Sequence, residues 1–151
     1  MNKRVPYEES LRVPLLMRYP KRIPANSERD QMVLNVDIAP TLYDLVGTDA
    51  PILLHGKSLL PVLDDPEAEL RDEFLAEYFL EKITPRHADW RAVRTERWKY
   101  IHYPKLEGMD ELYDLQSDPR ETTNLIGKPE HSATLERMRQ SLRKLLQATE
   151  G

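Results

Sequence analysis

The chain has 151 residues, of which 40% are hydrophobic and 32% charged, and its formal net charge is −4. This length and apolar content are enough for one domain, or for one domain and part of another. The acidic balance gives no electrostatic reason to expect nucleic acid or an anionic membrane surface as a partner. The sequence has no cysteine, which excludes disulfides, thiolate metal sites and a cysteine-derived nucleophile within it.

The first half of the chain combines short apolar segments with polar loops. Residues 13–17 form a brief apolar run with prolines within and beyond it, which predicts a short strand buried on both faces. Residues 37–47 predict a helix, because Asp37 can cap its start and Gly47 suits its end. Apolar residues recur at helical spacing between these two positions.

The second half of the chain begins after an acidic stretch at residues 64–71 and has a different pattern. Bulky and charged residues alternate there between turn signals, which predicts antiparallel strands. The tail carries an apolar stripe at helical spacing, with arginine and lysine opposite it. We therefore predict an α+β fold in which a four-stranded antiparallel sheet packs against a C-terminal amphipathic helix. The strands are expected at residues 73–79, 90–97, 98–103 and 111–115, and the helix at 132–148.

No residue pattern in the chain makes a complete active site. The serines lack nucleophile-elbow glycines, no glycine-rich phosphate loop exists, and the four histidines lack metal-ligand spacing. The carboxylate pair at residues 64–65 is more typical of a solvated loop than of a metal site. His102, inside a predicted strand, is expected to be a packing residue. His87, in a loop with Arg86 and close to Trp90, has the setting that best suits ligand contact.

Five segments along the chain carry a recognisable pattern: Lys3 with residues 7–15, then residues 36–42, 55–61, 91–101 and 111–125. In this order they resemble type I sulfatases, the arylsulfatase group of the alkaline-phosphatase-like superfamily. They cover nearly the whole chain, and one departure is His55, which stands where the family usually has aspartate. The resemblance is to the C-terminal portion alone, and it implies a fragment of an α/β catalytic domain at residues 1–68 and the C-terminal subdomain at 69–151.

The resemblance implies a specific role for Lys3. In the family, the lysine four residues before this tyrosine contacts the sulfate of the substrate, where a fixed ammonium stabilises charge that develops on oxygen. The family nucleophile is a formylglycine made within a C/S-x-P-x-R motif, and this sequence lacks that motif. We expect Ca²⁺ and formylglycine in the intact enzyme, no cofactor in this chain, and no activity from the chain alone.

The resemblance also implies that the second subdomain helps to shape the substrate cleft. Arg86, His87 and Trp90 are candidate substrate contacts, because a cation, a hydrogen-bonding ring and a stacking surface suit a sulfated sugar. The expected partner is a sulfate ester substrate, with sulfated carbohydrate as the favoured class. No apolar run reaches the roughly 18 to 20 residues of a membrane helix, so we expect no membrane partner. The compartment stays open between cytoplasm and periplasm, and if the parent protein is secreted, its export signal is expected upstream of this chain.

Two alternatives remain open at this point. One is a non-catalytic binding or assembly module that keeps the sulfatase C-terminal fold, and the other is a fragment of a related phosphodiesterase or phosphonate hydrolase. If the chain is a fragment, the helix at residues 37–46 should expose apolar surface, and the strand at 13–17 should be an unpaired edge. Self-association through this truncated face is then expected.

Overall fold

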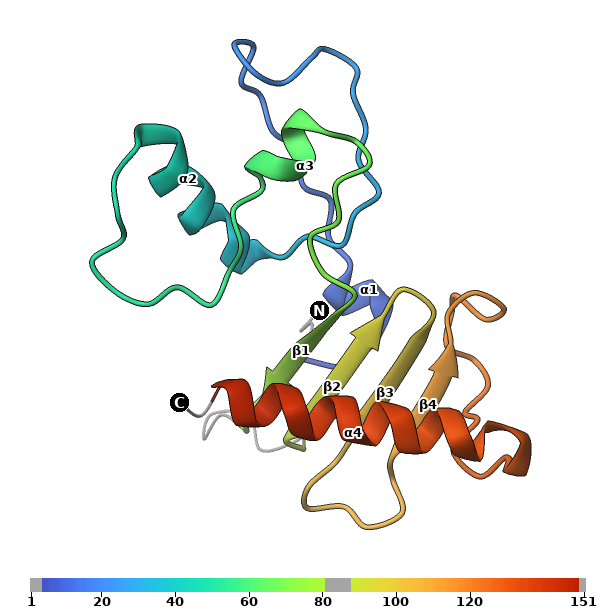
Figure 1. Ribbon diagram of the computed structural model, residues 1–151. Coiled ribbons are helices and arrows are strands. Elements are labelled where there is room, and N and C mark those ends of the chain that lie inside the picture. The colour runs from blue at the N-terminus through green and yellow to red at the C-terminus, as the bar shows by residue number, and fades with distance from the viewer. Residues whose placement is uncertain (1–3, 81–87, 150–151) are drawn as a thin grey trace. The chain divides into compact units, whose positions relative to one another are not determined.

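The computed structural model describes residues 4–80 and 88–149, which form two compact units (Figure 1). One unit contains the described residues up to Pro14 together with those from Glu73 onward, and it is termed the sheet unit below. The other is Leu15–Asp72, termed the helical unit. The junction at Glu73 lies five residues after the expected boundary at residue 68, and Tyr7 and Leu11 pack with the sheet.

The sheet unit is built on four antiparallel strands. They are β1 Glu73–Tyr78, β2 Trp90–Thr95, β3 Trp98–His102 and β4 Glu111–Asp114, and they lie in the order β1-β2-β3-β4. All four predicted strands are confirmed, with ends shifted by one or two residues. Thr95 closes the β2–β3 turn, because its hydroxyl accepts from the Trp98 N–H at 2.9 Å and donates to the Trp98 carbonyl at 3.2 Å.

One face of the sheet is covered by α4 (Ser132–Thr149), the predicted C-terminal helix, which lies across the strands in Figure 1. Met138 and Leu142 are its most buried side chains. They pack against inward-facing strand residues, namely Val93, Trp98, Tyr100 and Leu112. The two-layer α+β arrangement is therefore confirmed on this face.

The opposite face of the sheet is covered by the N-terminal segment, meaning residues 4–14, which contains the one-turn helix α1 (Glu8–Leu11). Tyr7 and Leu11 pack there against a second apolar cluster. The buried members of that cluster are Trp90, Ala92, Ile101, Tyr113 and Leu115. Because both faces of the sheet are covered, alternate residues along a strand are buried on either side of it.

The helical unit contains α2 (Ile38–Val46) and α3 (Leu60–Asp64), and a 3-10 turn (Asn35–Asp37) precedes α2. Gly47 ends α2 in the left-handed conformation with φ 68°, as predicted. Asp37 does not cap α2 with its side chain. Its carboxylate instead accepts from the N–H groups of Leu34 and Lys57 and from both terminal nitrogens of Arg71, so the buried side chain joins three segments.

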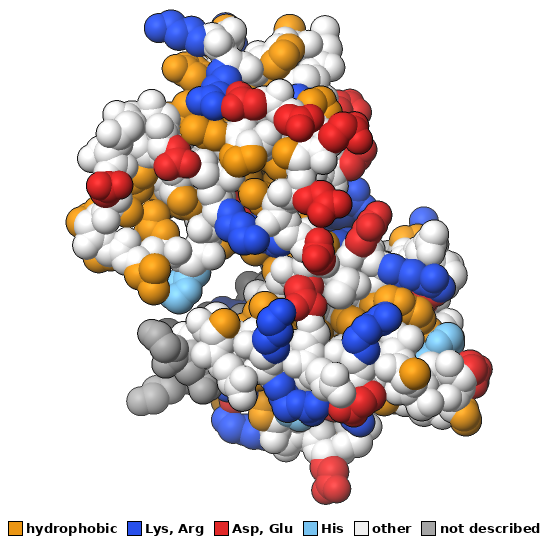
Figure 2. Space-filling view, in the orientation of Figure 1, with side chains coloured by type: hydrophobic (Ala, Val, Ile, Leu, Met, Phe, Trp, Pro, Cys, Tyr) orange, Lys and Arg blue, Asp and Glu red, His pale blue; other side chains and the backbone are white. Residues whose placement is uncertain are grey.

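Two of the sequence predictions concern residues 13–17, which span the boundary between the units after Pro14, and the helix α2. Residues 13–17 form no strand, because no neighbouring strand among the described residues supplies hydrogen bonds, and the Leu16 side chain is 94% exposed. The prediction of a strand buried on both faces is therefore wrong, and these residues pair with no strand among the described residues, as the fragment hypothesis expects. The predicted apolar surface on α2 is confirmed, since Ile38, Leu42 and Val46 are all exposed. Figure 2 shows hydrophobic side chains at the surface of this unit.

A close backbone approach joins two parts of the helical unit. A Cβ atom at Gly56 would lie 2.0 Å from the carbonyl oxygen of Val36, so only glycine fits at that position. Within residues 4–80 and 88–149, no helix is long and apolar enough to cross a bilayer.

Candidate functional site

Three of the predicted site residues, Lys3, Arg86 and His87, lie outside the described residues. Trp90 is described, and its side chain is 5% exposed. Its ring stacks on Tyr78, with centroids 6.1 Å apart, and its indole N–H donates to the carbonyl oxygen of Arg4 at 2.9 Å. The indole of Trp90 therefore binds Arg4, the residue next to Lys3. Because the Trp90 side chain is buried within the sheet unit, little of its ring is accessible to a ligand.

A buried lysine holds the chain immediately after Arg4. Lys99 extends from β3 toward the N-terminal segment, and its side chain is fully buried. The ammonium donates to the Pro6 carbonyl at 3.0 Å and to Glu8 Oε1 at 2.9 Å, and it forms an ion pair with Glu121 Oε1 at 2.5 Å. Two of its N–H donors are used in hydrogen bonds, and its positive charge faces both carboxylates. Lys99 therefore joins the N-terminal segment to the sheet and to the loop after β4.

Glu121 completes this arrangement from a strained backbone position. Its φ is 55°, in the left-handed region that side chains other than glycine rarely adopt. Its second oxygen accepts from the backbone N–H of Glu8 at 2.6 Å. Burial raises the pKa of Glu121 above its ordinary value, although Lys99 and the Glu8 N–H oppose that shift.

The Glu8 carboxylate lies between two cations. Besides Lys99, it faces Arg94 of β2, whose guanidinium lies 3.4 Å from Glu8 Oε2. Burial alone would raise the pKa of Glu8, but Lys99 and Arg94 outweigh it and hold that pKa below its ordinary value. The four side chains of Glu8, Arg94, Lys99 and Glu121 thus bring together two acids and two bases, and their formal charges cancel.

A second buried carboxylate anchors the same segment. Glu111 at the start of β4 accepts hydrogen bonds from three tyrosine hydroxyls, those of Tyr7 at 3.3 Å, Tyr103 at 3.0 Å and Tyr113 at 2.6 Å. Burial and the adjacent Glu111 charge raise the pKa of all three phenols above their ordinary value. The tyrosines therefore stay protonated as donors at neutral pH, and Tyr7 is fixed by this network.

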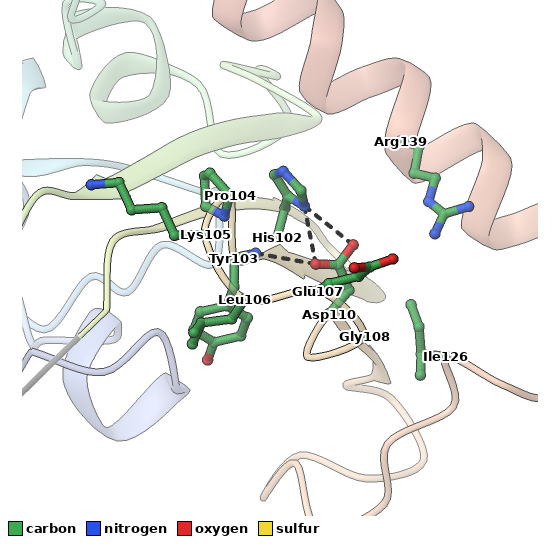
Figure 3. Close-up of a pocket in the computed structure, with 10 residues that line it drawn as sticks. All are labelled: His102, Tyr103, Pro104, Lys105, Leu106, Glu107, Gly108, Asp110, Ile126 and Arg139. Carbon is green, nitrogen blue, oxygen red and sulfur yellow. Dashed lines mark hydrogen bonds and ion pairs between the residues drawn. The ribbon is translucent and has the colours of Figure 1, made fainter.

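A surface hollow of about 580 Å³ lies beside the β3–β4 loop and α4 (Figure 3). At its base Asp110 accepts from the Tyr103 N–H at 3.1 Å and from the Tyr100 hydroxyl at 2.5 Å, and it contacts His102 Nδ1 at 3.0 Å. Burial alone would raise the pKa of Asp110, but these partners outweigh it and lower that pKa. The His102 ring stacks on that of Tyr100, with centroids 6.5 Å apart, so the residue packs in the sheet as expected and also belongs to this polar network.

The same end of the sheet carries an ion pair between two loops. Lys105 in the β3–β4 loop contacts Asp89 at 2.5 Å, and Asp89 also accepts from the Leu80 N–H at 2.5 Å. Asp89 directly precedes Trp90, which contacts Arg4. Leu80 and Asp89 border the segment that contains Arg86 and His87, and Arg4 follows Lys3. These bordering residues therefore lie at the same end of the sheet. They supply cations and hydrogen-bond donors, but no three His, Asp or Glu side chains among them could hold a metal ion.

Comparison with known proteins identifies the family. The family model described as "N-sulphoglucosamine sulphohydrolase, C-terminal" matches residues 1–148. The chain belongs to this sulfatase family. An N-acetylglucosamine-6-O-sulfatase of Bacteroides thetaiotaomicron is 37% identical over 147 residues, which cover 93% of this chain and 26% of the relative. This chain thus spans about a quarter of the length of the curated relatives it matches.

Solved structures agree with the sulfatase assignment. One, determined in complex with its substrate D-glucosamine-2-N,6-O-disulfate, superposes with a TM-score of 0.76 and 33% identity over 84% of this chain and 26% of that chain. A phosphonate monoester hydrolase of Agrobacterium radiobacter superposes with a TM-score of 0.62 and 30% identity over 74% of this chain and 24% of its own. The resemblance to sulfatases read from the sequence is confirmed, and the C-terminal fold is shared beyond sulfate esters.

Lys99, Glu111 and Glu121 were not singled out from the sequence. Lys99 alternates with Trp98 and Tyr100, which face α4, and such a lysine ordinarily points to solvent. It is buried because the N-terminal segment covers the second face of the sheet. The available signal was that each of the three residues lies within a segment that resembles the sulfatases.

Proposed function

We propose that this chain forms one side of the substrate cleft of a sulfuric ester hydrolase and supplies Lys3 as a contact to the sulfate group. The observation that carries the proposal is the hydrogen bond from Trp90 to Arg4, the covalent neighbour of Lys3. It fixes the backbone of the residue that directly follows Lys3 in the sequence. The match of residues 1–148 to a sulfatase C-terminal family supports the same role.

Lys3 suits the electrostatic demands of sulfate-ester cleavage. The reaction moves negative charge onto the sulfate and leaving-group oxygens, and an ammonium group held at that position lowers the barrier. Loss of one fixed donor of this kind typically reduces kcat by about 10²–10³-fold. Arg86 and His87 are proposed as further substrate contacts, because their loop ends at Asp89 and Trp90, close to Arg4.

The nucleophile and the calcium ion of the intact enzyme are assigned to another part of the polypeptide. This sequence has no cysteine and no C/S-x-P-x-R motif, and the described residues hold no cluster of three metal-ligating side chains. The sequence therefore does not fit the nucleophile, and its described part does not fit the calcium ion. A formylglycine would supply the attack on sulfur, while this chain would bind and orient the ester.

The proposed substrate class is a sulfated carbohydrate, specifically a sulfated amino sugar. Two observations favour it: the name of the N-acetylglucosamine-6-O-sulfatase relative and the disulfated glucosamine in the complex described above. The superposition on a phosphonate monoester hydrolase favours a second candidate, hydrolysis of a phosphonate ester. Both reactions place an anionic tetrahedral group beside the proposed lysine, so substrate profiling must separate them.

The exposed apolar side of α2 supports a partner for the helical unit. Ile38, Leu42 and Val46 would be covered by the remaining three quarters of a sulfatase in the intact enzyme. Self-association through the same surface and a non-catalytic assembly role are the competing proposals. Sedimentation of the chain with and without an upstream sulfatase fragment would distinguish them.

A chimaeric enzyme tests the proposed function. The C-terminal quarter of the Bacteroides N-acetylglucosamine-6-O-sulfatase is replaced by this chain, and sulfate release from N-acetylglucosamine 6-sulfate is measured beside hydrolysis of a phosphonate monoester. We expect sulfatase turnover that falls about 10²–10³-fold in Lys3→Ala, while Lys21→Ala, in the loop after Pro20, serves as the matched lysine control. Full activity in Lys3→Ala, or metal-dependent turnover by the isolated chain, would refute the proposal.

A further inference from the structure

The backbone just after Lys3 is held at successive points by the sheet unit. Trp90 binds the carbonyl of Arg4, and Lys99 binds the carbonyl of Pro6. Glu121 binds the N–H of Glu8, whose side chain returns to Lys99. Lys99, Glu8 and Glu121 are termed the ionic clasp below. Their burial and mutual distances make it the most enclosed group of charges in the sheet unit as described.

The composition of the ionic clasp points to a role other than stability. A buried ion pair recovers in Coulomb energy little more than its desolvation costs, so an apolar replacement of the whole group is often neutral for stability. In some proteins such groups specify a unique register, because other alignments leave the charges unpaired. The left-handed backbone of Glu121 has the same implication, since strain of this kind persists only where the surroundings determine it.

We infer that Lys99 and Glu121 are positioning residues that fix the register of the N-terminal segment, and thereby hold the backbone that follows Lys3. This inference rests on the proposed function for the role of Lys3. Lys99 and Glu121 do not touch the reacting atoms. They act through the backbone at Pro6 and Glu8, which lie three and five residues beyond Lys3.

The two tryptophans of the chain provide separate reporters on the two faces of the sheet. Trp90 binds Arg4 on the face covered by the N-terminal segment, whereas Trp98 packs in the cluster under α4. Exchange of the two indole N–H groups, followed by NMR in the 151-residue chain, therefore measures the segment and the core separately. Trp98 is the internal reference.

The test variant is Lys99→Met/Glu121→Gln, which removes one base and one acid and leaves Glu8 paired with Arg94. We expect indole exchange at Trp90 to accelerate at least about tenfold, as loss of charge-assisted hydrogen bonds implies, with Trp98 unchanged. Glu121→Gln alone is the second variant if the double variant does not fold. Leu142→Ala, which loosens the α4 face, should instead accelerate Trp98. Unchanged Trp90 exchange in a folded variant would overturn the inference.

The chimaeric enzyme separates this inference from the proposed function. Lys3→Ala tests the proposed function, and Glu121→Gln tests the positioning role with Lys3 intact. We expect Glu121→Gln to lower kcat about tenfold or more with little change in KM, because Lys3 is displaced while the remaining substrate contacts persist. If Lys3→Ala abolishes turnover but Glu121→Gln leaves kcat unchanged, the positioning role is wrong and the proposed function stands. If Lys3→Ala is harmless, the proposed function is wrong and the positioning inference that rests on it is overturned with it.

Discussion

Replacement of Asp37 by alanine should unfold the helical unit locally. The carboxylate is fully buried and binds both terminal nitrogens of Arg71 at 2.6 Å, besides two backbone N–H groups. Removing one partner of a buried ion pair costs about 3–5 kcal/mol. Each backbone N–H left without an acceptor adds about 1–3 kcal/mol where water cannot reach it. The sum is comparable with the whole stability of a small unit.

Hydrogen exchange measured by mass spectrometry is the appropriate assay, because both tryptophans lie in the sheet unit. In Asp37→Ala, peptides covering residues 34–63 should exchange at least about a hundredfold faster, which corresponds to about 3 kcal/mol of local stability. Tryptophan fluorescence reports on the sheet unit in the same sample. Asp44→Ala, an exposed aspartate on α2, is the matched control and should leave exchange unchanged.

Two further measurements sharpen this prediction. Asp37→Ala/Arg71→Met should exchange more slowly than Asp37→Ala, because it no longer contains an uncompensated buried guanidinium. Burial would raise the pKa of Asp37, but Arg71 and the backbone donors hold it below its ordinary 3.8. The stabilisation is therefore complete above that pH and is lost as the pH falls through the lowered pKa. A change below tenfold in Asp37→Ala at neutral pH would refute the reasoning.

Two other predictions concern the sheet unit. Leu142→Ala removes a buried side chain between α4 and the sheet, so it should lower the free energy of unfolding by about 2–5 kcal/mol in urea titrations. Gln140→Ala, on the exposed side of α4, should leave that free energy unchanged. Equal effects of the two variants would contradict the packing described. Burial and Asp110 raise the pKa of Tyr100 to about 12, so its stabilising contribution is present below its ordinary 10.0 and is lost as the pH rises through 12. Ultraviolet titration should show a late phenolate step that disappears in Tyr100→Phe, and an unchanged titration would exclude this assignment.

The strands and α4 could be predicted because local pattern and tertiary packing agree there. Alternation along 90–102 and the apolar stripe of α4 are each consistent with one face against a core. Residues 13–17 failed for the opposite reason. Their apolar content suits a buried strand, but a strand requires a neighbour, and none is present among the described residues.

The polar interior could not be predicted because side-chain reach is not encoded in local spacing. Asp37 has the sequence position of a helix cap, yet its carboxylate binds Arg71, which lies 34 residues later. Lys99 and Glu121 likewise pair although they are far apart in the sequence, and each also binds the N-terminal segment. The sequence indicated which family these segments resemble, and the structure gives the physical reason for their charged residues.

Position 121 faces two requirements that no ordinary residue meets together. Glycine, asparagine and aspartate tolerate a backbone φ of 55°, but they are too short to take the place of a glutamate that spans from the loop to Lys99. Longer side chains can reach but must accept the unfavourable backbone. Single substitutions at this position therefore exchange one defect for another. A designer who wishes to stabilise this loop would have to redesign position 99 at the same time, so the two sites should be varied as a pair.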